Sequence, residues 1–192
     1  MSVSIDKFSA LIVVDVQNDF CSGGALAVPE GDKVVYVLND YIARFFAKEA
    51  AIFATRDWHP MHHVSFKEHC GLWMPHCVQR TKGADFHKDL KLPFGVEIIS
   101  KGFLTEKDAY TGFEGTELER RLKHRGITRV FVGGLAADYC VKHTVLDALV
   151  RGFETYLLLD AIQGVSVKPT DSSEAVSEMQ RAGAKAITLL DV

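Results

Sequence analysis

The stretch Ala10-Leu-Ile-Val-Val-Asp15-Val16 decides the fold class of this chain. Its apolar residues are almost uninterrupted, and a strand that is apolar on both sides is typical of the buried interior of a parallel sheet. A glycine-rich turn, Cys21-Ser-Gly-Gly24, follows it, and apolar residues then recur at helical spacing from Val34 to Phe45. A buried strand followed by an amphipathic helix predicts a strand–helix–strand unit, which is the building block of α/β proteins.

The alternation of strands and helices continues to the end of the sequence. Further strands are expected at residues 51–55, 96–100, 129–133, 155–159 and 186–190, and helices at residues 116–126, 140–151 and 172–181. We therefore predict one domain over residues 1–192, a three-layer α/β/α fold with a six-stranded, largely parallel sheet. Residues 56–95 have no clean period and are expected to form a loop insertion that binds metal and substrate.

The composition excludes several classes of protein. Hydrophobic residues make up 47% and charged residues 24% of the 192 residues, which is typical of a globular protein, and the net charge of −3 gives no basic surface for nucleic acid or membrane. No apolar run approaches the ~20 residues of a membrane span, and no signal-peptide pattern is visible. The four cysteines form no Cys-x-x-Cys pair. We therefore expect a cytoplasmic protein with free thiols that acts on a small molecule, and homo-oligomerisation is left open.

Reactive side chains follow four of the expected strands. Asp15, Asp57 and Lys101 each end a strand, and Cys140 begins the helix after the fourth. Singly, such residues are often turn residues, solvated charges or small buried side chains. Together they predict a site, because the carboxyl ends of parallel strands form the active-site edge of a sheet. The helix start and Lys101 would stabilise a Cys140 thiolate, Asp15 would carry its proton, and backbone N–H groups of residues 133–137 would bind an oxyanion.

Five of the eight histidines lie close together in the sequence, at positions 59, 62, 63, 69 and 76. Asp57 and His59 are two residues apart, so their side chains point to the same side of an extended chain, and His63 and His76 follow. One carboxylate and two or three imidazoles suit one divalent transition metal with open positions, zinc first and iron or manganese as alternatives. The competing interpretation is a surface loop that happens to be rich in histidine. His62 and His63 are adjacent, and the sequence alone does not separate them as ligands.

Several motifs resemble those of nicotinamidases in the isochorismatase-like cysteine hydrolase superfamily. The similarity spans nearly the whole chain. It is carried by residues 11–24, by Thr55-Arg-Asp-Trp-His59, by Trp73-Met-Pro-His-Cys-Val78, by Lys101-Gly with Tyr110-Thr-Gly-Phe113, and by residues 132–149 around Cys140. One departure is Ala136-Ala-Asp138, where family members often have Ala-Thr-Asp.

The resemblance implies a role for each of these residues. It implies a catalytic triad of Asp15, Lys101 and Cys140, and metal ligands Asp57, His59 and His76 with His63 as the fourth. It implies a cis peptide between Leu135 and Ala136, with the Ala136 and Cys140 N–H groups as the oxyanion hole. It implies a substrate site in which Phe20 and Trp73 sandwich a pyridine ring, with Leu135 and Tyr110 beside it.

The activity that the resemblance implies is metal-dependent hydrolysis of nicotinamide to nicotinate and ammonia. The reaction would pass through a thioester on Cys140, would serve NAD salvage, and would extend to pyrazinamide. One alternative is a metal-free relative that cleaves another small amide or ureido substrate, or the vinyl ether of isochorismate. A second alternative is a flavodoxin-like receiver or binding domain, which also has an acidic residue and a lysine at strand ends.

Overall fold

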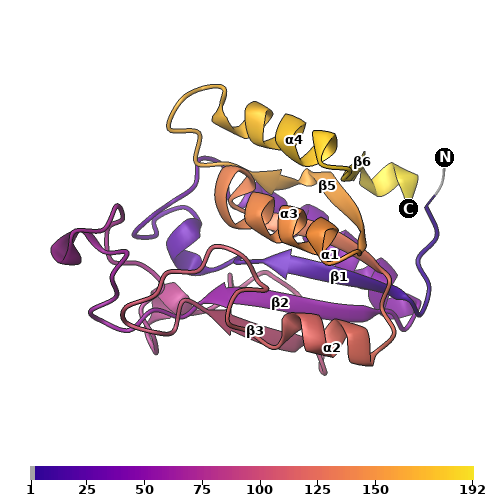
Figure 1. Cartoon of the computed structure of the whole chain (residues 1–192), viewed down its shortest axis with the longest axis horizontal. Coiled ribbons are helices and arrows are strands. Elements are labelled where there is room, and N and C mark those ends of the chain that lie inside the picture. Colours follow the sequence, from indigo (N-terminus) through magenta and orange to yellow (C-terminus); the bar gives the residue numbers. More distant parts are fainter. Residues whose placement is uncertain (1–2) are drawn as a thin grey trace.

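Six parallel strands form the centre of the molecule. The computed structural model describes residues 3–192, and within them the sheet has the order β3-β2-β1-β4-β5-β6, with every neighbouring pair parallel. Figure 1 shows the strands side by side. Their bounds are β1 (Ser9–Val14), β2 (Ala51–Asp57), β3 (Glu97–Lys101), β4 (Arg129–Leu135), β5 (Glu154–Gln163) and β6 (Lys185–Ile187). The prediction of a six-stranded parallel α/β sheet is confirmed.

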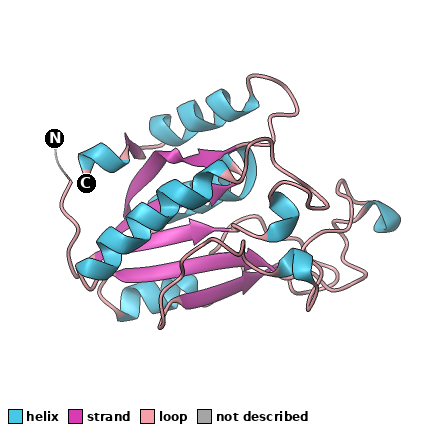
Figure 2. Ribbon diagram, turned by 180° about the vertical axis from the view of Figure 1, so that it is seen from behind, coloured by secondary structure: helices cyan, strands magenta, loops and turns pink. Residues whose placement is uncertain are grey.

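Helices cover both faces of the sheet (Figures 1 and 2). Their bounds are α1 (Lys33–Ala47), α2 (Leu118–His124), α3 (Lys142–Val150) and α4 (Asp171–Arg181). Alternate residues of β1 enter the two cores: Leu11 and Val13 pack on the side of α1, and Ile12 and Val14 on the side of the other three helices. This two-sided burial explains why the opening stretch is apolar at every position of the strand.

Several element boundaries differ from the expected ones; β5, for example, continues to Gln163, past the expected end at residue 159. The last strand ends at Ile187 and a 3₁₀ turn, Leu189–Asp191, follows, because the Asp191 carboxylate accepts hydrogen bonds from the Thr188 backbone N–H (2.8 Å) and hydroxyl (3.0 Å) and bends the chain. Cys140 lies within a π-helical turn, Ala137–Val141, which leads into α3. Cys140 thus stands in the turn before the regular helix.

The chain between β2 and β3 forms a long irregular segment at the carboxyl end of the sheet (Figure 1). Its helical content is limited to short 3₁₀ turns, η2 (Lys67–His69) and η3 (Lys82–Ala84). Isolated bridges, His59 with Val78 and Gln17 with Phe86, connect it to itself and to the chain after β1. The path is irregular, as the lack of periodicity indicated, and the binding of metal and substrate by this segment stays a prediction. Among residues 3–192, no helix is long and apolar enough to cross a membrane.

Candidate active site

A buried lysine stands at the centre of the site. The Lys101 ammonium, at the end of β3, lies 2.9 Å from Asp15 Oδ2, 2.5 Å from Asp57 Oδ1 and 3.3 Å from Cys140 Sγ. It also donates a hydrogen bond to the Ala109 carbonyl (3.2 Å). Burial lowers the pKa of Lys101, but the carboxylates of Asp15 and Asp57 outweigh burial and raise that pKa well above its usual range. The lysine is therefore a fixed positive charge beside the sulfur.

Asp15 is held so that one of its oxygens faces the nucleophile without a well-aligned donor. Thr55 donates its hydroxyl hydrogen to Asp15 Oδ1 at 2.6 Å. Oδ2 is buried and has no hydrogen bond of good geometry within residues 3–192, although Lys101 Nζ is close to it. A carboxylate oxygen of Asp15 lies within 4.8 Å of Cys140 Sγ. Burial raises the pKa of Asp15, Lys101 opposes that rise, and the net shift is upward. Asp15 is thus suited to accept a proton from the thiol.

The Cys140 thiol lies among groups that shift its pKa in opposite directions. Burial raises the pKa of this thiol well above its usual value, Lys101 lowers it, and the carboxylates of Asp15 and Asp57 raise it further. The two carboxylates thus oppose ionisation of the buried thiol, and the ammonium favours it. A Cys140 thiolate stabilised by the helix start and Lys101 stays a prediction. Asp15, close to the sulfur, is placed to take the thiol proton.

Asp57, His59 and His76 form a compact group of metal-binding side chains. One ligand atom from each lies within 4.8 Å of the other two, and His59 Nε2 is 3.6 Å from Asp57 Oδ2. His59 Nδ1 bonds the Gly102 carbonyl (2.9 Å) and His76 Nδ1 bonds the Met74 carbonyl (2.7 Å). A carbonyl can only accept, so each Nδ1 carries a hydrogen, and each Nε2 has a lone pair when its ring is neutral. This donor set, one carboxylate and two oriented imidazoles, fits a divalent transition metal.

Two residues that sequence reasoning missed fix these ligands in place. Gln17 is completely buried; its side chain accepts the Asp57 backbone N–H (2.7 Å) and donates to the Asp57 carbonyl (2.8 Å). Gly102 has φ +60°, and a Cβ there would lie 2.5 Å from Cε1 of His59. Glycine is therefore required directly after the catalytic lysine. The only sequence signal for the role of Gln17 was its polar side chain next to an apolar strand.

His63 lies next to the ligand group but outside it. Its ring stacks on His59 with centroids 4.1 Å apart, while Nε2 donates to the Lys107 carbonyl (3.1 Å) and Nδ1 accepts from the Ser65 hydroxyl (2.7 Å). Both ring nitrogens are thus occupied, and His63 as the fourth ligand stays a prediction. His62 is exposed and its ring contacts His69, away from the ligand group.

A pocket opens above the sulfur and the metal-binding residues. It encloses about 370 Å³, part of it open to solvent, and its wall includes Phe20, Trp73, Tyr110, Tyr139, Ala136, Cys140, Asp57 and His76. Trp73 Nε1–H donates to the Tyr110 hydroxyl (2.9 Å), and Trp73 packs edge-on against Tyr139. Phe20, Trp73 and Tyr110 therefore line the pocket, as the resemblance implied. Tyr139 was not expected, and its position next to Cys140 was the only signal for it.

Leu135 has a different place from the one expected. It is completely buried in the core on the side of α1 and does not line the pocket, because its side chain points back from the end of β4 into the sheet packing. The peptide bond between Leu135 and Ala136 is cis. The Ala136 N–H has no protein acceptor within residues 3–192, so it is free to bind an oxygen of a ligand.

Asp138 has a structural task next to the nucleophile. Its carboxylate accepts the backbone N–H groups of Val165 (2.9 Å) and Ser166 (2.8 Å). Val165 lines the pocket, so this pair of bonds holds the loop after β5 over the site. The acidic residue two positions before Cys140 thus shapes the pocket.

Comparison with known proteins agrees with this geometry. The isochorismatase domain profile matches residues 9–191. The nicotinamidase of Escherichia coli is 40% identical over 203 residues, which cover 95% of each chain. Among solved structures, a pyrazinamidase of Pyrococcus horikoshii in complex with zinc has a TM-score of 0.91 and 51% identity over 94% of this chain and 99% of that one. A protein of L. infantum in complex with nicotinate has a TM-score of 0.92 and 33% identity over 100% and 98% of the two chains. The profile match covers almost the entire sequence, and a cysteine, a lysine and an aspartate meet at the carboxyl edge of one parallel sheet. This chain therefore belongs to the isochorismatase family.

Proposed function

We propose that this chain is a metal-dependent amide hydrolase that converts nicotinamide to nicotinate and ammonia, and that it also accepts pyrazinamide. One observation carries the proposal. Cys140, with its buried partners Asp15 and Lys101, meets the three metal-binding residues at one aromatic pocket. The E. coli relative is a nicotinamidase, and the P. horikoshii structure is a pyrazinamidase with zinc. As part of the same proposal, residues 1–192 act as one domain and the metal is zinc.

The pocket is suited to a flat heteroaromatic carboxamide. Phe20, Trp73 and Tyr139 provide aromatic faces and edges for a ring in the same cavity that Cys140 lines. Asp57, His59 and His76 would hold the metal, which would supply a Lewis-acidic site for the ring nitrogen. A ring fixed in this way would bring its carboxamide to the sulfur, and such positioning removes much of the entropic barrier to attack.

The first half-reaction forms the thioester. Asp15 accepts the Cys140 proton while the sulfur attacks the carboxamide carbon, and the Lys101 ammonium, 3.3 Å from Sγ, stabilises the negative charge that develops. The N–H groups of Ala136 and Cys140 bind the oxyanion of the tetrahedral intermediate. Asp15 then returns the proton to the amide nitrogen, the carbon–nitrogen bond breaks, and ammonia leaves.

The second half-reaction releases the acid. A water molecule in the position vacated by ammonia gives a proton to Asp15 and attacks the thioester carbon. The same N–H groups bind the second oxyanion, the carbon–sulfur bond breaks, and the sulfur recovers its proton from Asp15. The product leaves as nicotinic acid and becomes nicotinate by giving its proton to the released ammonia. Asp15 and Cys140 are back in their starting protonation states, so one carboxylate serves both halves of the cycle.

Ammonia release from nicotinamide tests the proposal. Cys140→Ala should abolish turnover, a loss of at least ~1,000-fold given that one residue carries the covalent step, while metal content by elemental analysis stays unchanged. Chelation should remove activity from the wild-type enzyme, and added zinc should restore it. Full ammonia release by Cys140→Ala would contradict the thioester route, and an enzyme indifferent to chelation would contradict the role of the metal.

The two alternative functions are not favoured. A metal-free amide or ureido hydrolase does not need Asp57, His59 and His76 to converge, nor the two Nδ1 atoms to be bonded to carbonyls. A receiver domain has no need for a buried cysteine beside its lysine. The four cysteines are all free thiols, which fits the cytoplasm as the place where we propose that the enzyme works.

A further inference from the structure

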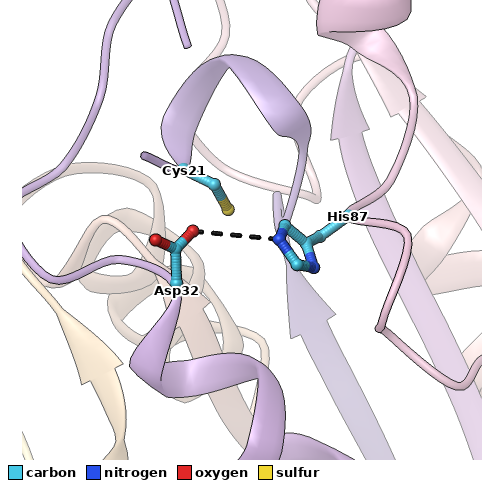
Figure 3. Close-up of side chains that lie close together, drawn as sticks. All are labelled: Cys21, Asp32 and His87. Carbon is cyan, nitrogen blue, oxygen red and sulfur yellow. Dashed lines mark ion pairs between the residues drawn. The ribbon is translucent and has the colours of Figure 1, made fainter. Parts of the chain in front are cut away.

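A second group of metal-binding side chains lies outside the active site. Cys21 Sγ, a carboxylate oxygen of Asp32 and a ring nitrogen of His87 all lie within 4.8 Å of one another. Figure 3 shows the sulfur directed toward the space between the carboxylate and the imidazole. Cys21 follows the 3₁₀ turn Asn18–Phe20, Asp32 precedes α1, and His87 belongs to the insertion. None of the three takes part in the amide chemistry described above.

The Asp32 carboxylate does not cap the helix that it precedes. An aspartate at the N-cap of a helix normally accepts a backbone N–H of the first turn, but Asp32 makes no such bond to α1. Its Oδ1 instead accepts the Ser22 backbone N–H (3.1 Å) and lies 3.8 Å from His87 Nε2. No lysine or arginine nitrogen of residues 3–192 is within 4.0 Å of this carboxylate. A negative group has thus been turned toward a thiol and an imidazole without a permanent positive partner.

The Cys21 thiol is not a reactive sulfur by itself. It is 2% exposed, and burial together with the Asp32 carboxylate raises its pKa to about 12. Such a thiol neither attacks nor oxidises readily, because both reactions need the thiolate. A divalent metal reverses this situation, since a coordinating thiol loses its proton outright. Sulfur, imidazole nitrogen and carboxylate oxygen are the three protein ligand types that zinc binds.

The backbone holds the three side chains close to their positions before any ion binds. The His87 N–H donates to the Val16 carbonyl (2.9 Å) and the Cys21 N–H to the Asn18 carbonyl (3.1 Å). At Gly31 a Cβ would lie 2.8 Å from the Phe20 carbonyl oxygen, so the intervening loop is folded tightly on itself. Coordination through His87 Nε2 would cost only the long contact of the Asp89 N–H with Nδ1 (3.3 Å). The side chains of His87 and Asp32 are 16% and 36% exposed, which leaves a route for an ion and room for water.

We propose that Cys21, Asp32 and His87 bind a second divalent metal ion, of the zinc type, with water as the fourth ligand. The site is structural. The loop between Cys21 and Asp32 carries Leu26 and Val28 into the substrate pocket, directly after Phe20. An ion bound there ties this pocket wall to the insertion that supplies the histidines of the active site.

Metal stoichiometry tests the proposal with the full chain. Protein stripped by chelation, reloaded with Zn²⁺ and desalted should contain two zinc ions per chain by elemental analysis. Cys21→Ser and His87→Gln should each contain one, and His59→Ala should also contain one, retained at the second site. Cys70→Ser, at an exposed free cysteine, is the matched control and should keep two. One zinc in the wild type together with none in His59→Ala would overturn the proposal and leave a hydrogen-bonded cluster.

Cobalt distinguishes the two sites spectroscopically. The active-site group of Asp57, His59 and His76 contains no sulfur, whereas the second site does. In a Cys140→Ala background, which removes the nearby catalytic thiol, added Co²⁺ should give a thiolate-to-cobalt charge-transfer band in the near ultraviolet. Cys21→Ser in that background should abolish the band, and His59→Ala should leave it. A band that survives Cys21→Ser, or no band at all, would overturn the assignment.

Discussion

Replacing Gly102 by alanine tests whether the backbone beside the catalytic lysine sets the orientation of a metal ligand. Gly102 has φ +60°, and its carbonyl accepts the His59 Nδ1–H at 2.9 Å. An alanine Cβ would lie 2.5 Å from Cε1 and 2.8 Å from Nδ1 of His59, closer than such atoms approach one another in proteins. The imidazole would have to turn away, and its Nε2 would leave the position that faces Asp57.

The structure separates two costs of this substitution. An alanine in the left-handed region costs ~1–2 kcal/mol of folding stability. Disturbing the group that orients a metal-bound histidine typically weakens metal binding ~10–100-fold, which is about 1.4–2.8 kcal/mol. Gly115→Ala has only the first cost, because Gly115 has φ +66° and a Cβ at that residue would meet no atom within 4 Å. The difference between the two variants therefore isolates the contact with His59.

Competition with a chromophoric chelator measures the metal affinity of both variants, and denaturant unfolding of the metal-free proteins measures their stability. We expect Gly115→Ala to lose ~1–2 kcal/mol of unfolding free energy and Gly102→Ala at least as much, because its Cβ also clashes with His59. Only Gly102→Ala should bind metal ~10–100-fold more weakly and release ammonia slowly at limiting zinc. Equal metal affinities for Gly102→Ala and Gly115→Ala would refute the reasoning, because the clash with His59 would then have no effect on coordination.

Three further substitutions test the supporting residues. Thr55→Val removes the donor to Asp15 Oδ1. A hydrogen bond to a charged group is worth ~1.5–3 kcal/mol, so kcat/KM should fall ~10–150-fold. Thr55→Ser should keep most of the rate, and similar rates for the two variants would contradict this role. Tyr110→Phe removes the acceptor for Trp73 Nε1–H; KM should rise ~2–10-fold with kcat little changed, and a lower kcat at constant KM would argue against a binding role. His63→Ala should weaken metal binding but retain the ion, because both ring nitrogens are occupied elsewhere; complete loss of metal in elemental analysis would identify His63 as the fourth ligand.

The reactive residues could be predicted from the sequence because their positions follow from strand order alone. Any parallel sheet brings the carboxyl ends of its strands to one edge, so Asp15, Lys101 and Cys140 had to come close if the strands were correctly placed. The ligand pair Asp57 and His59 could be predicted in the same way, because side chains two residues apart point to the same side of an extended chain. Helix boundaries at glycine were equally readable, since Gly126, Gly152 and Gly183 all adopt positive φ after a helix.

The supporting residues could not be predicted, because their roles depend on contacts between segments far apart in the sequence. Thr55 and Gln17 reach residues 40 positions away, Asp15 and Asp57 respectively, and no local pattern marks either contact. The insertion has no period from which to derive its path, so its histidines could be grouped but not oriented. The same limit hid the cluster of Cys21 with Asp32 and His87, which needs three separate segments to meet.

The position of the pocket follows from one feature that the alternation of strands and helices does not reveal. This feature is the point where the chain reverses its direction across the sheet. From β1 the chain passes over one face through α1 to β2 and β3, and it then returns over the other face through α2 to β4 on the far side of β1. The crossovers therefore diverge between β1 and β4, and a crevice is left at their carboxyl ends. Asp15 stands on one side of this crevice and Ala136 with Cys140 on the other, while β2 and β3 add Asp57 and Lys101 from the same side as Asp15. The proton acceptor and the nucleophile thus come from the two strands that only tertiary pairing makes neighbours, and β5 and β6 supply none of the reacting groups because they lie beyond the reversal.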